Sequence, residues 1–319
     1  MRRILLSTIK ILISAALLYF SLRKINLADL ASRLNVSSLG WIGLAIAVTF
    51  LQIFVGVLRW REVSAECGAP LETRQAMRFN LIGTFFNQTL PSSIGGDAVR
   101  LWLVARAAAG WRAATYSIFV DRAIGLIALA IIIVASLPWS YRLITDPNGR
   151  SALLLVDFAA LAGGVGFLVL GMLPWPWLKR WWGTHHLHAC AVIANRVIFS
   201  RDRGPRIAVY SVLVHVLAVV IAWCVVQSIA APVVFGQIFQ LVPPVMLITM
   251  LPISIAGWGV REATMGLAFG YAGLMTTEGV NVSLLFGAVN FIVGAFGGLV
   301  WIFSAEKAAQ GAAPIEVPE

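Results

Sequence analysis

Long apolar runs recur along the 319-residue chain at the length that a membrane crossing requires. A helix needs about 20 predominantly apolar residues to span the hydrocarbon core of a bilayer. Uninterrupted runs of this kind predict spans near residues 4–22, 39–58, 113–137, 151–173, 207–231 and 281–303. The alternation of apolar and polar residues that is typical of a transmembrane β-barrel does not extend far enough anywhere. The pattern therefore predicts an all-α integral membrane protein, a polytopic helical bundle with these six full spans.

The first of these runs also resembles the start of a secretory signal peptide, because Met-Arg-Arg precedes it. No small-residue cleavage site follows a full-length hydrophobic region around Leu17–Arg23. We therefore interpret residues 4–22 as a retained first span. Lys10 within it is expected to extend its ammonium group to the membrane interface, although a functional intramembrane lysine is the alternative.

Two further apolar regions, residues 79–110 and 236–275, are interrupted in the middle by proline, glycine and charged residues. The interruptions read LPSSIGGDAVR at 90–100 and LPISIAGWGVR at 251–261, with seven identities in eleven ungapped positions. Two such matching segments, each at the centre of an interrupted region, indicate an internal repeat. The repeats extend over about residues 39–137 and 207–303 within a single transmembrane domain of residues 1–319.

Each interrupted region has arms that are too short to cross a membrane. About 12 residues precede Pro91 and about 13 follow Asp97, compared with the roughly 20 needed for a span. The two regions are therefore predicted to be re-entrant hairpins. Irregular backbone at membrane depth is tolerated where it lines a cavity or is buried in protein. When the 174–206 connection is placed in the cytoplasm, the three spans between the two hairpins make the first hairpin enter from the cytoplasm and the second from outside, so the repeat is inverted.

Composition and charge agree with a membrane protein and place one connection in the cytoplasm. The chain is 60% hydrophobic and 12% charged, its mean hydropathy is +0.87 and its net charge is +10. In such a protein an excess of Lys and Arg marks cytoplasmic loops and contacts with anionic lipids, not nucleic-acid binding. The connection 174–206 has six basic residues, one acid and four tryptophans. It is therefore predicted to be a cytoplasmic loop at the interface, with both chain termini on the same side.

Two features of the chain need separate comment. His185, His186 and His188 lie in the 174–206 connection without a carboxylate or cysteine at suitable spacing, so we interpret them as an interfacial cluster and predict no metal site. The three cysteines also show neither disulfide nor zinc spacing. The segment 23–38 carries three basic residues and would lie outside, which runs against the charge bias.

Ionisable residues gather at the interruptions and in the neighbouring span 113–137. They are Asp97, Arg100, Asp121, Arg122, Arg261 and Glu262. A lone charge at the bilayer centre costs at least about 2.5–3.5 kcal/mol, so these residues should pair or face water. One hypothesis is that they only hold the hairpins to the span. Adjacent residues cannot pair on a helix, so Asp121 is predicted to pair with Arg100 or Arg261, and Arg122 with Asp97 or Glu262.

The other hypothesis is that the charges line a path for a lipid headgroup. Arginine holds phosphate oxygens with two parallel hydrogen bonds, which suits such a path. Helix starts just after Gly96 and Gly257 would direct backbone N–H groups to the same place and form an anion site. Neutral polar residues add to it along the first arm and in the last span: Asn80, Asn87, Gln88, Thr89 and Asn290.

Three motifs, in this order, resemble those of a known membrane family. NQTLPSSIGGDAVR, VDRAIGL at 120–126 and LPISIAGWGVREA resemble the lysylphosphatidylglycerol synthase transmembrane-region family, also described as flippase-like domain proteins. The resemblance covers nearly the whole chain. It implies a lipid-flipping or lipid-handling domain like the N-terminal half of multiple-peptide-resistance proteins, with relatives near hopanoid and polyprenyl-linked sugar pathways. The family's motif positions correspond to Pro91, Gly95, Gly96, Asp97, Arg100, Asp121, Arg122, Pro252, Gly257, Gly259, Arg261 and Glu262.

The resemblance does not imply aminoacyl transfer, because that reaction belongs to a separate soluble domain of the family. The chain ends about 16 residues after its last predicted span, so no such domain is expected. We therefore expect a protein of the prokaryotic cytoplasmic membrane that moves or handles an amphipathic lipid with an anionic or lipid-linked headgroup, without cofactor or metal. Without a nucleotide-binding GxxxxGK[ST] motif, it would use an ion gradient, with Asp97 or Glu262 carrying the proton, or a downhill lipid gradient.

Two alternatives remain open from the sequence. The chain could be a membrane-embedded lipid-modifying enzyme with Asp97 as base, or a non-transporting subunit beside lipid-biosynthesis enzymes. Against the enzyme, no Asp-x-Asp cluster and no Ser–His or Cys–His arrangement is evident. The internal repeat favours transport, because alternating access uses two related halves.

Overall fold

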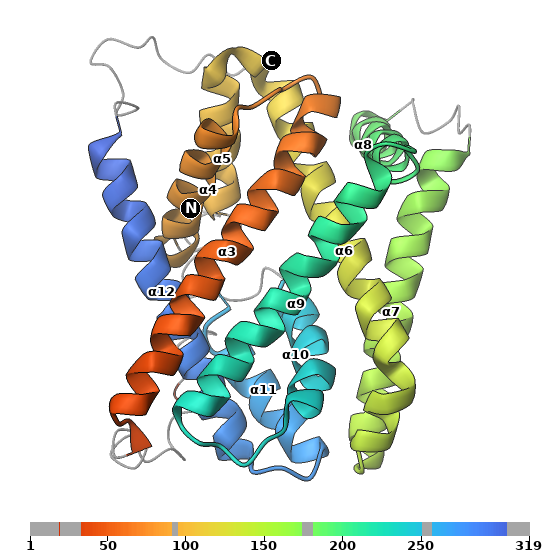
Figure 1. Cartoon of the computed structure of the whole chain (residues 1–319). Helices are drawn as coiled ribbons and strands as arrows, with labels where there is room; N and C mark the ends of the chain where they lie inside the picture. Colours follow the sequence, from red (N-terminus) through yellow and green to blue (C-terminus); the bar gives the residue numbers. More distant parts are fainter. Residues whose placement is uncertain (1–18, 20–32, 91–94, 174–180, 251–256, 305–319) are drawn as a thin grey trace.

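The structure is a computed structural model that describes residues 19, 33–90, 95–173, 181–250 and 257–304 (Figure 1). These residues form helices α3 to α12 and one short π-helix, η1, and they include no β-strand. The predicted all-α class is confirmed. The predicted first span, residues 4–22, lies outside the described residues except for Tyr19.

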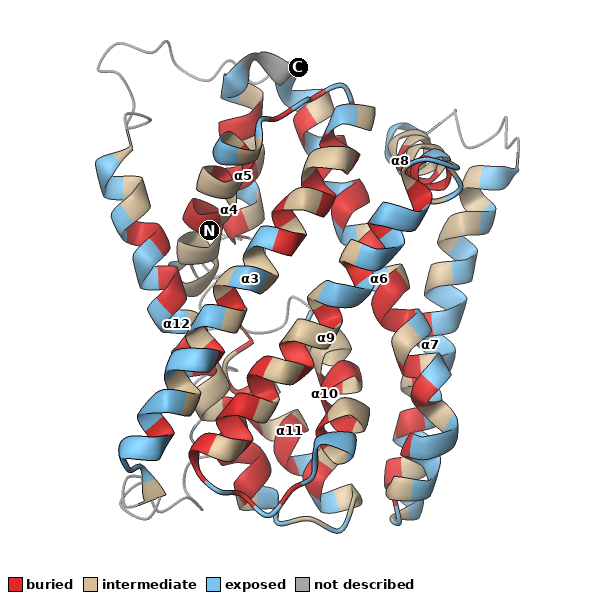
Figure 2. Ribbon diagram, in the orientation of Figure 1, coloured by how far each residue is buried: buried red, intermediate tan, exposed pale blue. Residues whose placement is uncertain are grey.

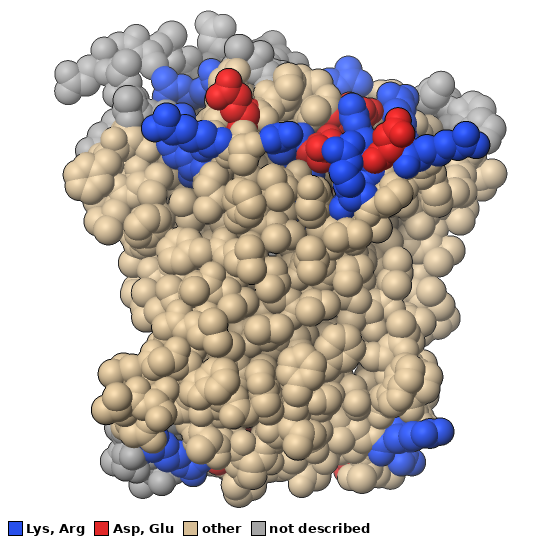
Figure 3. All heavy atoms as spheres, viewed as in Figure 1, with Lys and Arg blue, Asp and Glu red and all other residues tan. Residues whose placement is uncertain are grey.

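Five helices are long and apolar enough to cross a membrane, and they correspond to five of the six predicted spans. They are α3 (Val36–Glu66), α6 (Gly110–Leu143), α7 (Pro147–Met172), α9 (Gly204–Ser228) and α12 (Thr276–Phe303). On the face of the molecule shown in Figure 3, charged side chains gather at the two ends and leave an uncharged band between them. Such a band is what an apolar membrane core requires of the surface.

Local capping explains where two of the long helices begin. The side chain of Asn35 accepts a hydrogen bond from the Ser38 amide at 3.1 Å, and the Ser38 hydroxyl accepts one from the Asn35 amide at 3.0 Å. This reciprocal pair satisfies two amides that the first turn of α3 leaves without a helical partner. At α7, the Asp146 carboxylate accepts from the amides of Asn148 and Gly149, at 2.8 and 3.0 Å, with Pro147 at the first helical position.

Both interrupted regions fold as pairs of short helices. The first contains α4 (Thr73–Thr89), α5 (Gly95–Val104) and η1 (Ala105–Ala109), and the second contains α10 (Phe235–Thr249) and α11 (Val260–Tyr271). Figure 1 places α4 and α5 in the half of the bundle that also holds α8, and α10 and α11 in the opposite half. The two pairs of short helices therefore lie in opposite halves of the bundle.

Helix contacts follow a two-fold pattern that matches the sequence repeat. Helices α3 and α9 pack against each other and run in opposite directions (Figure 1). The other contacts among helices α3 to α6 and α9 to α12 come in matching pairs. Helix α4 packs on α12 as α10 does on α6, and α5 packs on α6 as α11 does on α12. Likewise, α3 packs on α6 as α9 does on α12. Each half thus completes its packing with the last helix of the other half.

The connection 174–206 was predicted to be a loop. The structure instead places helix α8 (Trp182–Ile198) in it. Figure 1 shows α8 nearly end-on, lying across the end of the bundle. The helix buries one side, which includes Cys190, Ala191 and Ala194, while Trp181 at its start and Trp182 are exposed. A helix of this length with one polar side does not produce the continuous apolar run by which spans are recognised in a sequence. The loop prediction was therefore incorrect.

The histidines at the start of α8 take part in ordinary polar and ring contacts. His186 Nδ1 lies 2.5 Å from the Tyr116 hydroxyl of α6, and its ring packs edge-on against Trp182. Over the residues that the structure describes, no group of three or more His, Cys, Asp or Glu side chains is arranged to hold a metal.

Ion pairs between helices stabilise both ends of the bundle. At the α8 end, Arg203 of the α9 start pairs with Glu66 of α3, and Arg206 lies 3.7 Å from Glu62. At the other end, Arg33 donates to Glu278 of α12 at 2.6 Å. Arg33 is one of the bases that contradicted the charge bias, and its acidic partner offsets that charge locally.

Cysteine labelling tests whether the two ends face opposite sides of a membrane. Trp111, at the start of α6, is 51% exposed and Met275, just before α12, is 56% exposed. We expect Trp111→Cys and Met275→Cys to react with an impermeant thiol reagent from opposite sides. The native Cys67, Cys190 and Cys224 are buried and are replaced first. Labelling of both variants from one side would contradict this arrangement.

The native thiols are also poor targets, so incomplete replacement would add little background. Burial raises the pKa of the Cys67 thiol to about 12 and that of the Cys190 thiol to about 11. Because the thiolate is the reacting form, both thiols should label slowly at neutral pH.

Candidate functional site

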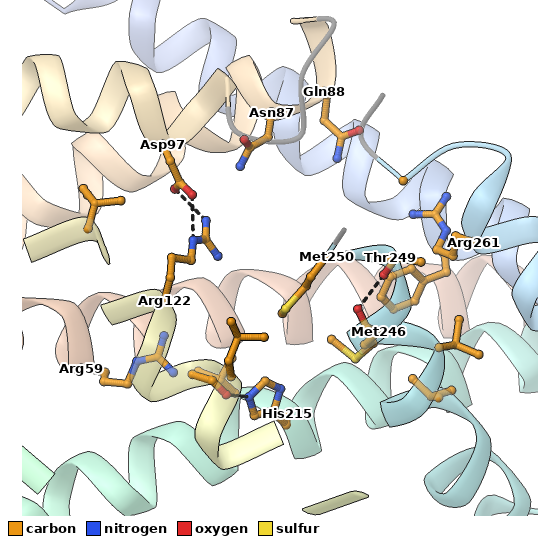
Figure 4. A pocket seen from close by; sticks show the side chains of 18 of the residues that line it. Arg59, Asn87, Gln88, Asp97, Arg122, His215, Met246, Thr249, Met250 and Arg261 are labelled. Atoms are coloured by element: carbon orange, nitrogen blue, oxygen red, sulfur yellow. Dashed lines mark hydrogen bonds and ion pairs between the residues drawn. The ribbon is translucent and has the colours of Figure 1, made fainter. Parts of the chain in front are cut away.

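A cavity of about 690 Å³ lies between the two hairpins and the helices that pack on them (Figure 4). Most of its wall is apolar, with side chains such as Leu101, Ile118, Phe119, Met246 and Met265. The polar lining residues come from helices α3, α4, α5, α6, α9 and α10 and from the Gly257–Tyr271 segment: Arg59, Asn87, Gln88, Asp97, Thr115, Arg122, His215, Thr249 and Arg261. The cavity therefore combines an apolar wall with a few charged and polar groups.

Asp97 and Arg122 form the most accessible ion pair of the cavity. Arg122 Nε donates to Asp97 Oδ2 at 2.8 Å, and its Nη2 donates to Oδ1 at 2.7 Å. The carboxylate is therefore bound by two parallel hydrogen bonds along the Nε–Nη2 edge of the guanidinium. The side chain of Arg122 nevertheless remains 45% exposed. This pair joins the first hairpin to α6, and it is one of the two that the sequence predicted for Arg122.

Arg100 supports Asp97 from behind and does not line the cavity. Its Nη1 donates to Asp97 Oδ1 at 3.2 Å, one helical turn away on α5. Its guanidinium carbon lies 4.0 Å from the centre of the Trp60 ring, and the residue is buried. A cation stacked on an aromatic face is stabilised by the ring quadrupole, so Arg100 acts as an anchor of the first hairpin.

Asp121 pairs with Arg59 of α3, and the predicted pairing with Arg100 or Arg261 is wrong. Arg59 Nε donates to Asp121 Oδ1 at 2.9 Å and Nη2 donates to Oδ2 at 3.3 Å, with both residues buried. The pairing arises because α3 packs against α6 at this level. The predicted span 39–58 ends one residue before Arg59, so the apolar pattern gave no sign of this partner.

Glu262 is fully buried and holds the start of α11 in place. Its Oε2 accepts from the Gly259 amide at 2.6 Å, and its Oε1 accepts from Arg261 Nη2 and from the Ser283 hydroxyl, both at 2.9 Å. Gly257 and Gly259 have φ angles of +78° and +83°, which side-chain-bearing residues rarely adopt. Arg261 and Gly257 reach the cavity, whereas Glu262 and Gly259 lie behind it.

Two backbone amides close to the predicted anion site are engaged by side chains of the protein itself. Helix α5 begins at Gly95 and α11 at Val260. The Gly96 amide donates to the Asn87 side-chain oxygen at 2.9 Å, just as the Gly259 amide donates to Glu262. Because the protein's own side chains take these donors, the arginines are the better anion ligands. Pro91 and Pro252 lie outside the described residues.

The structure thus brings six of the predicted residues to one cavity: Asn87, Gln88, Asp97, Arg122, Gly257 and Arg261. Gly95, Gly96, Arg100, Asp121, Gly259 and Glu262 support them from outside the lining. Sequence reasoning missed Arg59 and His215 as lining residues. The signal for His215 was available, because an ionisable side chain inside the apolar run 207–231 needs a partner or a polar cavity.

Comparison with known proteins adds one finding. The family model described as "Lysylphosphatidylglycerol synthase TM region" matches residues 7–298 of the chain. The match includes both hairpins and every cavity residue named above. No curated protein sequence matches the chain at a significant level.

Proposed function

This chain belongs to the lysylphosphatidylglycerol synthase TM-region family, and from that premise we propose that it moves an amphipathic lipid between the two leaflets of a membrane. The observation that carries the proposal is the cavity, where arginines from α3, α6 and α11 stand within an apolar wall. An amphipathic lipid needs both environments at once, one for its headgroup and one for its chains.

The arginines favour a headgroup that carries phosphate. Arg122 presents a partly exposed guanidinium from α6, and Arg261 enters from the second hairpin on another side of the cavity (Figure 4). A planar guanidinium binds phosphate oxygens with two parallel hydrogen bonds, which an ammonium group does not reproduce. Among the lining residues that the structure describes, Asp97 alone is acidic, against three arginines, so an anionic group is attracted to the cavity.

Exposed apolar residues beside Arg122 supply a path for the lipid chains. Phe119 and Leu126 of α6 and Met250, next to α10, line the cavity and are also exposed at the protein surface. Their exposure indicates that the cavity opens sideways towards the apolar surroundings of the bundle. A headgroup can then enter while the acyl chains stay in the membrane.

The two-fold contact pattern supports transport by alternating access. In inverted-repeat transporters, broken helices from both halves meet at a site near the membrane midplane. Here α5 and α11 start at the cavity from opposite ends of the bundle and would be the inner arms of two re-entrant hairpins. Rocking of one half against the other would expose the same arginines to each side in turn.

The basic residues orient the bundle with the α8 end in the cytoplasm. Figure 3 shows that charged side chains are denser at that end. Of the arginines that the structure describes, three lie near the other end, Arg33, Arg142 and Arg150, each next to the first or last turn of α3, α6 or α7. Nine of the described arginines lie at the α8 end, namely Arg61, Arg74, Arg78, Arg106, Arg112, Arg196, Arg201, Arg203 and Arg206. By the positive-inside rule that end, which includes the end of α12, is cytoplasmic.

Lysine substitution tests the headgroup role. We expect Arg122→Lys and Arg261→Lys to insert and remain folded, yet to move phospholipid about 5- to 100-fold more slowly in proteoliposomes, because each loses a bidentate phosphate contact. Arg142→Lys, at the far end of the same helix as Arg122, is the matched control and should keep the wild-type rate. Wild-type rates in both cavity variants would mean that the arginines only hold the hairpins.

A further inference from the structure

Two buried polar atoms at the cavity have no hydrogen-bond partner within the described part of the chain. They are Nη1 of Arg59 and Nδ1 of His215. Both residues line the cavity, although they are only 6% and 3% exposed. A buried polar atom without a partner costs about 1–3 kcal/mol, so such atoms usually mark a place that something else fills.

The two side chains converge on one glycine from different helices. His215 of α9 approaches Gly125 of α6, with its Nε2 2.9 Å from the Gly125 carbonyl oxygen. Arg59 comes from α3 and passes the same residue, because a methyl group built on Gly125 would lie 3.2 Å from both Nη1 and Nη2. Asp121, one turn earlier on α6, fixes the guanidinium through Nε and Nη2 and leaves Nη1 free. Glycine at position 125 thus keeps this corner of the cavity open.

The chemistry of the two atoms is complementary. A carbonyl oxygen only accepts, so Nε2 of His215 is the donor to Gly125, and in the neutral ring Nδ1 is then an acceptor. Arg59 Nη1 is a charged donor. A ligand that satisfies both atoms must offer an anionic oxygen to Arg59 and a hydrogen-bond donor to His215. A phosphodiester whose headgroup carries a hydroxyl or amino group has both.

We propose that Arg59, His215 and Gly125 form a headgroup subsite that selects phospholipids with a hydrogen-bond donor next to the phosphate. This inference rests on the proposed function, because it assumes that a phospholipid headgroup enters the cavity. Arg59 binds the phosphate, and Nδ1 of His215 accepts a hydrogen bond from the headgroup donor. A choline headgroup, which has a phosphate but no donor, leaves Nδ1 of His215 unsatisfied and is disfavoured.

Binding of three lipids with identical chains tests the subsite. The full chain, purified in detergent, is titrated with dioctanoyl phosphatidylglycerol, phosphatidylethanolamine and phosphatidylcholine, which offer a hydroxyl donor, an ammonium donor and no donor. We expect the first two to bind about 5- to 30-fold more tightly than the third, the effect of one satisfied buried hydrogen bond. The hydroxyl and ammonium arms also distinguish which donor the subsite prefers.

Three variants separate the roles of the residues. His215→Leu should remove the preference over choline, and His215→Gln, which keeps a donor and an acceptor, should restore part of it. Arg59→Lys should weaken all three lipids by a similar factor and leave the preference intact. Ser211→Ala is the matched control, because Ser211 lies one turn away on α9, is equally buried and does not line the cavity.

If the leucine variant does not fold, Gly125→Ala replaces it as a probe. Its methyl group would crowd the free nitrogen of Arg59 without removing any polar group, so all three lipids should bind more weakly. Equal affinity of the wild type for the three lipids would overturn the subsite and mean that water alone fills the corner. Preference that persists in His215→Leu would do the same. Neither result would contradict the proposed movement of lipid between leaflets, because that activity is measured in a separate experiment.

Discussion

Arg59→Ala is expected to lower the free energy of unfolding by about 3–5 kcal/mol, the cost of leaving one member of a buried ion pair uncompensated. Asp121 is buried in α6 and receives two hydrogen bonds from Arg59. Without the guanidinium, its carboxylate must either stay charged away from water or take up a proton. Chemical denaturation in detergent measures the loss in the free energy of unfolding, and the melting midpoint gives the direction of the change independently.

A double substitution shows whether the loss comes from the surviving charge. Arg59→Leu combined with Asp121→Leu should be clearly more stable than Arg59→Ala alone, because no unpaired charge remains. Arg61→Ala is the matched control on the same helix. Arg61 is only partly buried and contacts the Thr73 hydroxyl, so it should cost less than about 1 kcal/mol. Equal losses in the single and double variants would contradict the buried pair.

Gly96→Ala is the second substitution with a large expected effect. A methyl group built on Gly96 would lie 2.0 Å from the carbonyl oxygen of Gly83 and 2.6 Å from the Asn87 side chain. Helices α4 and α5 are therefore in backbone contact at this point, and the hairpin must open to admit even one carbon. Overpacking of this kind costs about 1–3 kcal/mol, and a backbone obstacle places it at the upper end of that range.

Gly43→Ala provides the comparison for Gly96→Ala. A methyl group on Gly43, within α3, meets no atom within 4 Å. Alanine there should stabilise the helix by about 0.5–1 kcal/mol, because glycine loses more backbone freedom on folding. Opposite signs for the two variants are predicted. A neutral Gly96→Ala would show that α4 and α5 do not approach as closely as the structure has them.

Hydropathy and the internal repeat predicted most of the fold. The apolar runs located α3, α6, α7, α9 and α12, since a span must be long and continuous whatever its packing. The two LPxSI-type interruptions located the breaks between α4 and α5 and between α10 and α11, because proline and glycine end helices locally. Helix α8 was missed because its buried side is short and its other side polar, so its helical form depends on packing against the bundle end.

The site was harder to predict, because its pairs join residues that are distant in sequence. Asp97 and Arg122 are 25 positions apart, and the sequence predicted Asp97 as one of two partners for Arg122, but Arg59 and Asp121 are 62 apart and meet only because α3 packs on α6. Arg100 and Arg122 look equivalent in the motifs. Only the structure shows that Arg100 faces Trp60 while Arg122 faces the cavity.

Blocking the cavity tests the central claim most directly. Ala98 of α5 lines the cavity and is exposed, so Ala98→Cys, without the native cysteines, can be modified in detergent with a bulky maleimide and then reconstituted. Leu155→Cys, on the exposed side of α7 and outside the cavity, is the control. Movement of a fluorescent phospholipid between leaflets is followed with an impermeant quencher. Our account predicts that modification stops lipid movement for Ala98→Cys and leaves Leu155→Cys unchanged; equal rates before and after modification of Ala98→Cys would contradict it.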